Sequence, residues 1–138
     1  MTATTISEYI VTKCVNDGCP VSNLQLQKFL FYIQKAYLAR GMSAFPDGIE
    51  AWQFGPVVPS VYYKFCGYGA MPITAMFNAI LPAEDKTVID SIVEEKRVLN
   101  PWDLVRETHN PTGAWAKVYD EGRGNRNLIE LDLIRSMG

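Results

Sequence analysis

The fold of this chain depends on one stretch between two helical regions, Phe45-Pro-Asp-Gly-Ile-Glu-Ala-Trp-Gln-Phe-Gly-Pro-Val-Val-Pro-Ser-Val-Tyr-Tyr-Lys-Phe-Cys-Gly-Tyr-Gly69. Alternation from Ile49 to Phe54 predicts a short extended segment with one aromatic face. Gly55-Pro56 then breaks the chain, because proline fixes φ, lacks an N–H group and restricts the residue before it. Pro59 can take the first position of a new helix, where a missing N–H costs nothing. The stretch therefore predicts a strand, a rigid corner and a short helix.

Helix signals precede this stretch. Ser22 and Gln25 have the spacing of a capping box, and the residues after them predict a helix that runs to about Arg40. Apolar side chains occur around more than one face of this helix, which predicts a central position with contacts on several sides. Nearer the N-terminus, the Thr5-x-x-Glu8 pattern predicts a first helix that ends at Asp17-Gly18.

The C-terminal half predicts several shorter helices. Their starts are expected where an N-cap or first-turn residue stands, at Pro82, Asn100, Thr112 and Asp132. Apolar residues between Pro72 and Pro82 also have helical spacing, although the two prolines enclose little chain.

The organisation of the chain predicts one folded unit. An extended Leu128-Ile129 would pair with the Ile49–Phe54 segment, and no repeat, low-complexity tract or linker divides the sequence. We therefore predict a single compact domain over residues 1–138, mainly α, with six or seven helices and a minor two-stranded β pairing.

Composition is that of a globular protein. The 138 residues are 48% hydrophobic and carry a formal net charge of −2, so a core is available but no general positive field exists to attract nucleic acid. No run of about 18 apolar residues occurs, and the N-terminus lacks the basic and apolar regions of a secretory signal. We expect a cytoplasmic protein that does not enter a membrane.

The cysteines and the single histidine give little support to catalysis or metal binding. Cys14, Cys19 and Cys66 lack the paired short spacings of a zinc site, so we expect reduced thiols that fill the core, with no metal and no cofactor. Cys66 and His109 are the one thiol and base that a small hydrolase would need. No nucleophile elbow or phosphate loop accompanies them, and we predict that the chain is not an enzyme.

Two features leave the kind of partner open. Arg123 and Arg126, with Lys117 nearby, have the charge to contact phosphate, although so few charges in a loop commonly serve only solubility. Trp52, beside the Gly55-Pro56 break, is equally compatible with the core and with an interface, where tryptophan is a favoured anchor.

Two motifs resemble those of a known family. The first is Leu26-Gln-Lys-Phe-Leu-Phe-Tyr-Ile-Gln-Lys-Ala-Tyr37, and the second is Ala51-Trp-Gln-Phe-Gly-Pro-Val-Val-Pro-Ser-Val-Tyr62 followed by Tyr68-Gly69. Together with Leu104-Val-Arg-Glu-Thr-His109, they resemble the Panacea antitoxin domain of GepA-like and SocA-like phage-associated proteins, formerly a domain of unknown function. The resemblance covers about residues 6–137. The chain departs from the family pattern at Ala114, where proline is expected, and at its non-aromatic C-terminal end.

The resemblance implies a non-enzymatic antitoxin. Such a protein neutralises a cognate protein toxin by binding it, and one branch of the family resembles a proteolytic adaptor that delivers the toxin to a AAA+ protease. The alternative is a DNA-binding regulator of a mobile element or prophage that reads operator DNA. The resemblance leaves open whether the chain acts as a monomer or as a homodimer.

The family motifs fall on nine residues of this sequence: Gln27, Lys28, Tyr32, Trp52, Gly55, Pro56, Val57, Pro59 and Tyr62. We expect Gly55 and Pro56 to shape the corner, and Trp52 and Tyr62 to line a groove. The polar pair, Gln27 and Lys28, would then hydrogen-bond free backbone groups of the corner or contact the partner. The other interpretation is that all nine residues only stabilise the fold.

Overall fold

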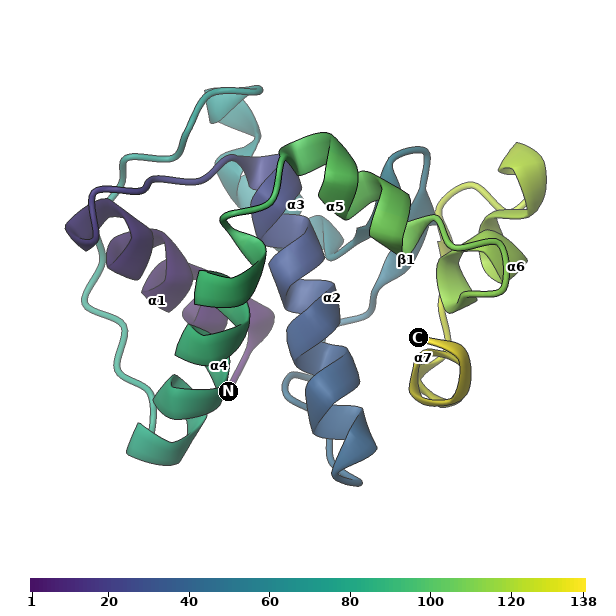
Figure 1. The fold of residues 1–138 in the computed structure, drawn as a ribbon, viewed down its shortest axis with the longest axis horizontal. Helices are drawn as coiled ribbons and strands as arrows, with labels where there is room; N and C mark the ends of the chain where they lie inside the picture. Colours follow the sequence, from purple (N-terminus) through teal and green to yellow (C-terminus); the bar gives the residue numbers. More distant parts are fainter.

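A computed structural model describes residues 1–138 and places one long helix, α2 (Asn23–Ala39), at the centre of the molecule (Figure 1). The predicted capping box is present, because the Ser22 hydroxyl accepts from Gln25 N and the Gln25 side chain accepts from Ser22 N. α2 contacts helices on several sides and also the small sheet. Its predicted central position is therefore confirmed.

Six further α-helices surround α2, in agreement with the predicted mainly α domain. They are α1 (Ala3–Asn16), α3 (Pro59–Phe65), α4 (Ala83–Lys96), α5 (Pro101–Thr108), α6 (Ala114–Tyr119) and α7 (Leu131–Met137), with 3-10 turns at Cys66–Tyr68 and Asp120–Gly122. α1 begins earlier than predicted, because the Thr2 hydroxyl caps it by accepting from Thr5 N. No helix is long and apolar enough to cross a lipid bilayer.

The sheet corrects the prediction for the central stretch. β1 (Glu50–Trp52) pairs with β3 (Asn127–Leu128) as expected, but it also pairs with β2 (Gly55–Val57), which gives the antiparallel order β2-β1-β3. The rigid corner predicted at Gly55-Pro56 is wrong, since both residues begin the second strand of a tight hairpin. Gly55 makes the turn with φ of +118°, and β2 is an edge strand, where proline is tolerated.

The segment from residue 72 to residue 82 is extended, so its predicted helical character is wrong. Its side chains alternate, with Ile73 and Leu81 buried while Met76 and Ile80 are exposed. Ile73 N donates to Val21 O at 2.8 Å, and Phe77 N donates to the Thr12 hydroxyl at 2.9 Å. The segment runs past α1 to the start of α4 (teal in Figure 1). Prolines at both ends leave too little chain for a helix, and the period-2 pattern is the one that is buried.

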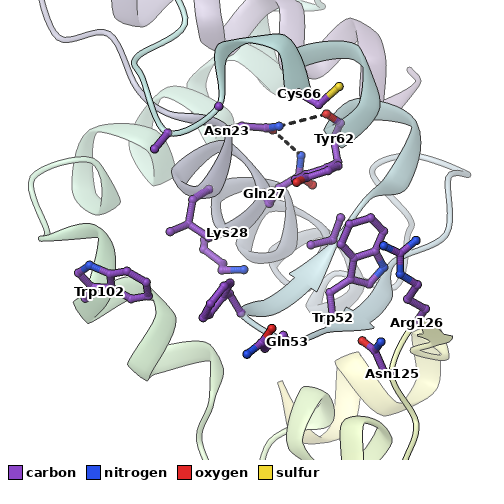
Figure 2. A pocket seen from close by; sticks show the side chains of 15 residues that line it. Asn23, Gln27, Lys28, Trp52, Gln53, Tyr62, Cys66, Trp102, Asn125 and Arg126 are labelled. Carbon is purple, nitrogen blue, oxygen red and sulfur yellow. Dashed lines mark hydrogen bonds between the residues drawn. The ribbon is translucent and has the colours of Figure 1, made fainter. Parts of the chain in front are cut away.

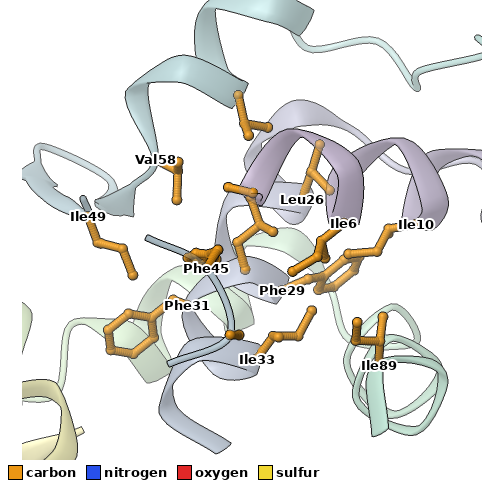
Figure 3. Close-up of a cluster of buried hydrophobic side chains, with 14 of the residues drawn as sticks. Ile6, Ile10, Leu26, Phe29, Phe31, Ile33, Phe45, Ile49, Val58 and Ile89 are labelled. Atoms are coloured by element: carbon orange, nitrogen blue, oxygen red, sulfur yellow. The ribbon is translucent and has the colours of Figure 1, made fainter. Parts of the chain in front are cut away.

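The core lies between α2, α1, α4 and the segment that leads into the sheet. Figure 3 shows side chains from these elements meeting, among them Ile6, Ile10, Leu26, Phe29, Ile33, Phe45, Ile49 and Ile89. All eight are at most 2% exposed. Burial of such side chains contributes about 1.5–3 kcal/mol each, so this cluster is the main source of stability.

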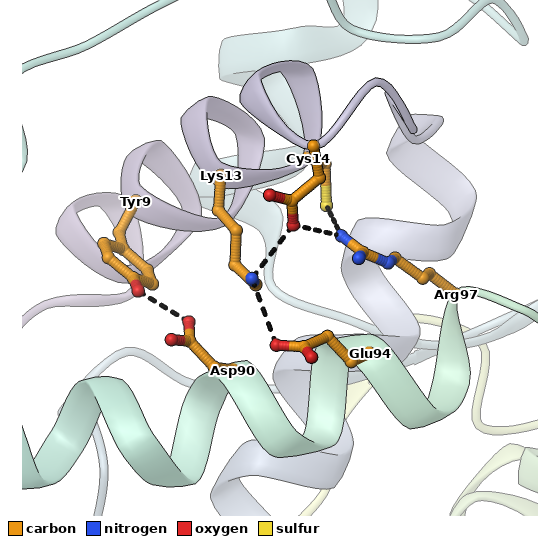
Figure 4. Close-up of polar contacts among 7 residues, drawn as sticks. Tyr9, Lys13, Cys14, Asp90, Glu94 and Arg97 are labelled. Carbon is orange, nitrogen blue, oxygen red and sulfur yellow. Dashed lines mark hydrogen bonds and ion pairs between the residues drawn. The ribbon is translucent and has the colours of Figure 1, made fainter.

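Paired polar groups connect α1 to α4 beside this core (Figure 4). Tyr9 donates to Asp90 at 2.5 Å, and its burial together with this contact raises the pKa of the Tyr9 hydroxyl to about 12. Lys13 lies 2.9 Å from Asp17 and 3.1 Å from Glu94. Arg97 also reaches Asp17, at 2.8 Å. Each cation at this interface therefore has a carboxylate partner.

Candidate functional site

An open cavity of about 510 Å³ lies between the first turns of α2, the β1–β2 hairpin, α3, the start of α5 and the turn before β3 (Figure 2). Its lining residues are mostly aromatic, apolar or amide-bearing: Asn23, Leu24, Gln27, Lys28, Trp52, Gln53, Phe54, Val57, Tyr62, Cys66, Gly69, Ala70, Trp102, Asn125 and Arg126. Cavities of this size commonly hold ligands or anchor side chains.

Gln27 fixes the back wall of the cavity. Its Oε1 accepts from Val58 N at 2.8 Å, and its Nε2 donates to Asn23 Oδ1 at 3.0 Å. Asn23 in turn donates to the backbone oxygen of Tyr62 at 3.1 Å. Val58 precedes α3 and has no side-chain cap, so the buried Gln27 amide satisfies a helix-end donor that would otherwise be orphaned.

Lys28 lies at the floor of the cavity and is fully buried. Its ammonium donates only to Pro56 O, at the long distance of 3.4 Å, and no carboxylate lies within ion-pair distance. Burial lowers the pKa of the Lys28 amine to about 7. Gly55 is packed directly against it, since a Cβ at that position would stand 2.6 Å from Lys28 Nζ.

Aromatic rings form one wall, and an arginine covers them. Trp52 meets Tyr62 edge to face with ring centroids 4.9 Å apart. The Arg126 guanidinium lies 4.2 Å from the centre of the Trp52 ring and donates to the Tyr63 hydroxyl at 3.2 Å. Figure 2 shows Trp52 and Arg126 side by side, with Asn125 below them. The guanidinium is thus held over a π face, a favourable arrangement for a cation.

Two exposed aromatic residues stand at the mouth of the cavity. Phe54, in the hairpin turn, is 48% exposed, and Trp102, in the first turn of α5, is 52% exposed. Their rings meet edge to face at 5.7 Å. Large aromatic side chains left in solvent are typical of surfaces that bind another protein.

The thiol and the base considered for catalysis have separate surroundings. Cys66 is exposed and its Sγ contacts Tyr63 O at 3.2 Å, whereas His109 stacks on Trp115 with ring centroids 3.7 Å apart. Burial, followed by the charge of Lys28, lowers the pKa of His109, and its Nε2 is buried without a partner. Cys66 lines the cavity and His109 does not. No group of three His, Cys, Asp or Glu side chains is placed to hold a metal ion.

The cysteines correct one expectation. Cys14 is buried, as predicted for a core thiol, but Cys19 and Cys66 are exposed. Cys19 follows the end of α1, and Cys66 begins the 3-10 turn after α3, so both lie where the chain leaves a helix and no second layer covers it.

The structure brings together five of the nine motif residues as cavity lining: Gln27, Lys28, Trp52, Val57 and Tyr62. The others lie elsewhere: Gly55 and Pro56 in β2, Pro59 at the start of α3, and Tyr32 away from the cavity. The Tyr32 hydroxyl donates to Glu107 at 2.6 Å, and Lys96 lies over its ring.

Sequence reasoning missed Asn23, Phe54 and Trp102 and did not connect Arg126 to this cavity. Trp102 carried a usable signal, because a tryptophan directly after an Asn100-Pro101 helix start stands in an exposed first turn. Arg126 precedes the predicted Leu128-Ile129 strand, but its position over Trp52 also depends on its own backbone φ of +69°, for which the sequence gives no signal.

Comparisons with known proteins show which family the chain belongs to. Residues 26–116, which include the whole β1–β2 hairpin and α2 from its second turn, match the family described as "Antitoxin SocA-like, Panacea domain". The chain is 26% identical over 127 residues to the protein named "Antitoxin SocA" of Caulobacter vibrioides (strain NA1000 / CB15N), an alignment that covers 82% of this chain and 68% of that protein. No protein of solved structure matches the chain.

Proposed function

The chain belongs to the SocA-like Panacea antitoxin family, and on that premise we propose that it neutralises a cognate protein toxin by binding it directly, without catalysing a reaction. The observation that carries this proposal is the half-exposed aromatic pair at the cavity mouth, Phe54 and Trp102. Aromatic side chains that project beside a concave surface are the usual anchors of protein interfaces. Both residues lie within the part of the chain that matches the family.

Co-expression with the neighbouring reading frame tests the proposal. A tagged wild-type chain should co-purify with the toxin and restore growth to cells that express it. Trp102→Ala should weaken toxin binding at least tenfold, because it removes an exposed anchor that supports little of the fold. Wild-type chain that neither binds the neighbouring product nor restores growth would contradict the proposal.

Delivery of the bound toxin to a AAA+ protease is a further form of the same function. An adaptor must bind toxin and protease at once, so toxin half-life in cells should fall when the chain is present and should recover when the protease is deleted. Masking alone predicts a toxin half-life that the chain leaves unchanged or lengthens, because a bound toxin is protected.

Operator binding stays an untested alternative to which the basic turn adds no support. Arg123 pairs with Asp120 at 3.2 Å, which leaves Arg126 as a single unpaired arginine in this turn of a chain whose net charge is −2. A DNA-binding chain should shift its own promoter DNA with an affinity that falls steeply as salt rises. Absence of any shift at low salt would remove this alternative.

A further inference from the structure

No carboxylate forms an ion pair with either of the two cations of the cavity, and the Glu50 carboxylate beside it accepts from the Trp52 indole N–H at 3.0 Å. None of its 15 lining residues is Asp or Glu, whereas Lys28 and Arg126 contribute two cations. The chain as a whole has a net charge of −2. The cavity therefore differs in sign from the average surface of the molecule.

Lys28 at the cavity floor has unmet hydrogen-bonding capacity. An ammonium has three N–H donors, and the only protein acceptor here is Pro56 O at 3.4 Å. Removing a cation from water without pairing it is unfavourable, and an apolar side chain of the same length would fill the same space at lower cost. The fold alone therefore gives no reason for an amine at this position.

Arg126 at the cavity rim is held in place while most of its donors stay free. Its backbone adopts φ of +69°, uncommon for a residue with a side chain, and its N–H donates to Ala51 O at 2.6 Å. Only one side-chain hydrogen bond is made, to the Tyr63 hydroxyl. Four other arginines each reach a carboxylate, namely Arg97, Arg106, Arg123 and Arg135. Arg126 and Arg40 reach none, and of these two only Arg126 lines the cavity.

The cavity walls near Lys28 and Arg126 are aromatic. Trp52 and Tyr62 stand on one side and Trp102 on another, and Figure 2 shows Trp52 and Trp102 flanking Lys28 in that view. A complementary group therefore combines a negative end with an apolar body. An acidic side chain next to an apolar residue in a peptide has this chemistry.

We propose that the cavity binds an acidic side chain of the toxin, whose carboxylate pairs with Arg126 at the rim and is attracted by the Lys28 amine at the floor. An apolar residue next to that acid packs between Trp52 and Trp102. This inference rests on the proposed function, because it names the chemistry by which the toxin is recognised.

Titration calorimetry with the purified cognate toxin tests the proposal on the intact chain. Arg126→Gln and Lys28→Met should each weaken binding at least tenfold, and the salt dependence of affinity should be smaller for Arg126→Gln than for wild type. Arg123→Gln is the matched control, since Arg123 lies in the same turn, pairs with Asp120 and does not line the cavity. It should stay within twofold of wild type. Equal affinity of wild type and both cavity variants overturns the proposal and leaves the antitoxin function standing.

A small probe tests the same cavity without the toxin. Millimolar benzoate should shift the indole N–H resonances of Trp52 and Trp102, whereas neutral benzamide should not, and Arg126→Gln should abolish the benzoate effect. Equal responses to benzoate and benzamide, or no response to either, overturn a carboxylate site. If the chain binds benzoate but no toxin, the toxin is not the ligand of this cavity and the proposed function is also contradicted.

Discussion

Two groups of cations in this molecule differ in whether carboxylates pair with them. At the α1–α4 interface, Lys13 and Arg97 meet Asp17 and Glu94 at 2.8–3.1 Å. At the cavity, Lys28 and Arg126 meet no carboxylate, and Lys28 is fully buried. A buried amine without a carboxylate is unfavourable for the fold, so the unpaired Lys28 indicates a role outside it.

The largest expected effect comes from Gly55→Ala, which would break the packing over Lys28. An added Cβ would stand 2.6 Å from Lys28 Nζ and 2.9 Å from the Thr108 hydroxyl, at a φ of +118° that alanine rarely adopts. We expect a loss of about 2–4 kcal/mol in the free energy of unfolding, measured by urea denaturation. Gly67→Ala is the control, since nothing lies within 4 Å of its Cβ position, and it should change stability by less than about 0.5 kcal/mol. Equal effects of the two substitutions would contradict the packing argument.

Lys28→Met should increase stability, which sharpens the contrast between the two groups. The folded pKa of Lys28 is about 7 against an ordinary 10.5, so the folded state disfavours the proton that the unfolded state retains. The resulting cost is fully present below about pH 7 and declines to nothing near pH 10.5. At pH 7 the variant should be more stable by about 3 kcal/mol, after the lost bond to Pro56 O is subtracted.

Denaturation between pH 6.5 and pH 9 checks this prediction. The advantage of Lys28→Met over wild type should shrink by about 1 kcal/mol per pH unit above pH 7. A variant that is less stable than wild type at every pH would show that the amine supports the fold, and the contrast with the α1–α4 interface would disappear.

Lys13→Met should have the opposite sign and a smaller size. The substitution leaves Glu94 without its cation, while Asp17 keeps Arg97. We expect a loss of about 1 kcal/mol in thermal or urea denaturation near pH 7, because the pair is only partly shielded from water. A gain in stability would mean that paired and unpaired lysines are equally unfavourable here.

Arg126→Gln should have the smallest effect on stability. The guanidinium lies over Trp52 and makes one hydrogen bond near the surface, so its removal should cost no more than about 1 kcal/mol. The fluorescence of Trp52 should change because the ring loses its cover. A loss much larger than this would assign Arg126 to the fold and would remove the reason to treat it as a binding group.

Local signals were sufficient to predict much of the helical framework. Ser22 and Gln25 begin α2 as expected because a capping box involves groups only three residues apart. Asn100 and Pro101 begin α5 for the same kind of reason. The prediction for the segment before α4 was wrong, because its five apolar residues fit a helical and an extended pattern almost equally well. The tertiary contacts of Ile73 and Phe77 decide between the two patterns.

The candidate site could be predicted only in part. Gln27, Lys28, Trp52 and Tyr62 stood out because they occur in two recognisable motifs. Phe54 and Trp102 did not stand out in the sequence, although they are the most exposed aromatic pair at the cavity. They are 48 residues apart in sequence, so no local pattern relates them.

The sequence by itself determined the mainly α character, the central helix, the pairing of β1 with the C-terminal strand, and the family. Most of these features follow from caps, periodicity and motifs, which are local; the pairing of β1 with β3 joins distant segments, and the sequence indicated it only through two short extended patterns. The hairpin at Gly55-Pro56, the burial of Lys28 and the placement of Arg126 over Trp52 were decided only by the tertiary structure. The last two depend on which distant segments pack together and exclude water, and the hairpin, although local, is covered by α2 and α5, which pack against β2.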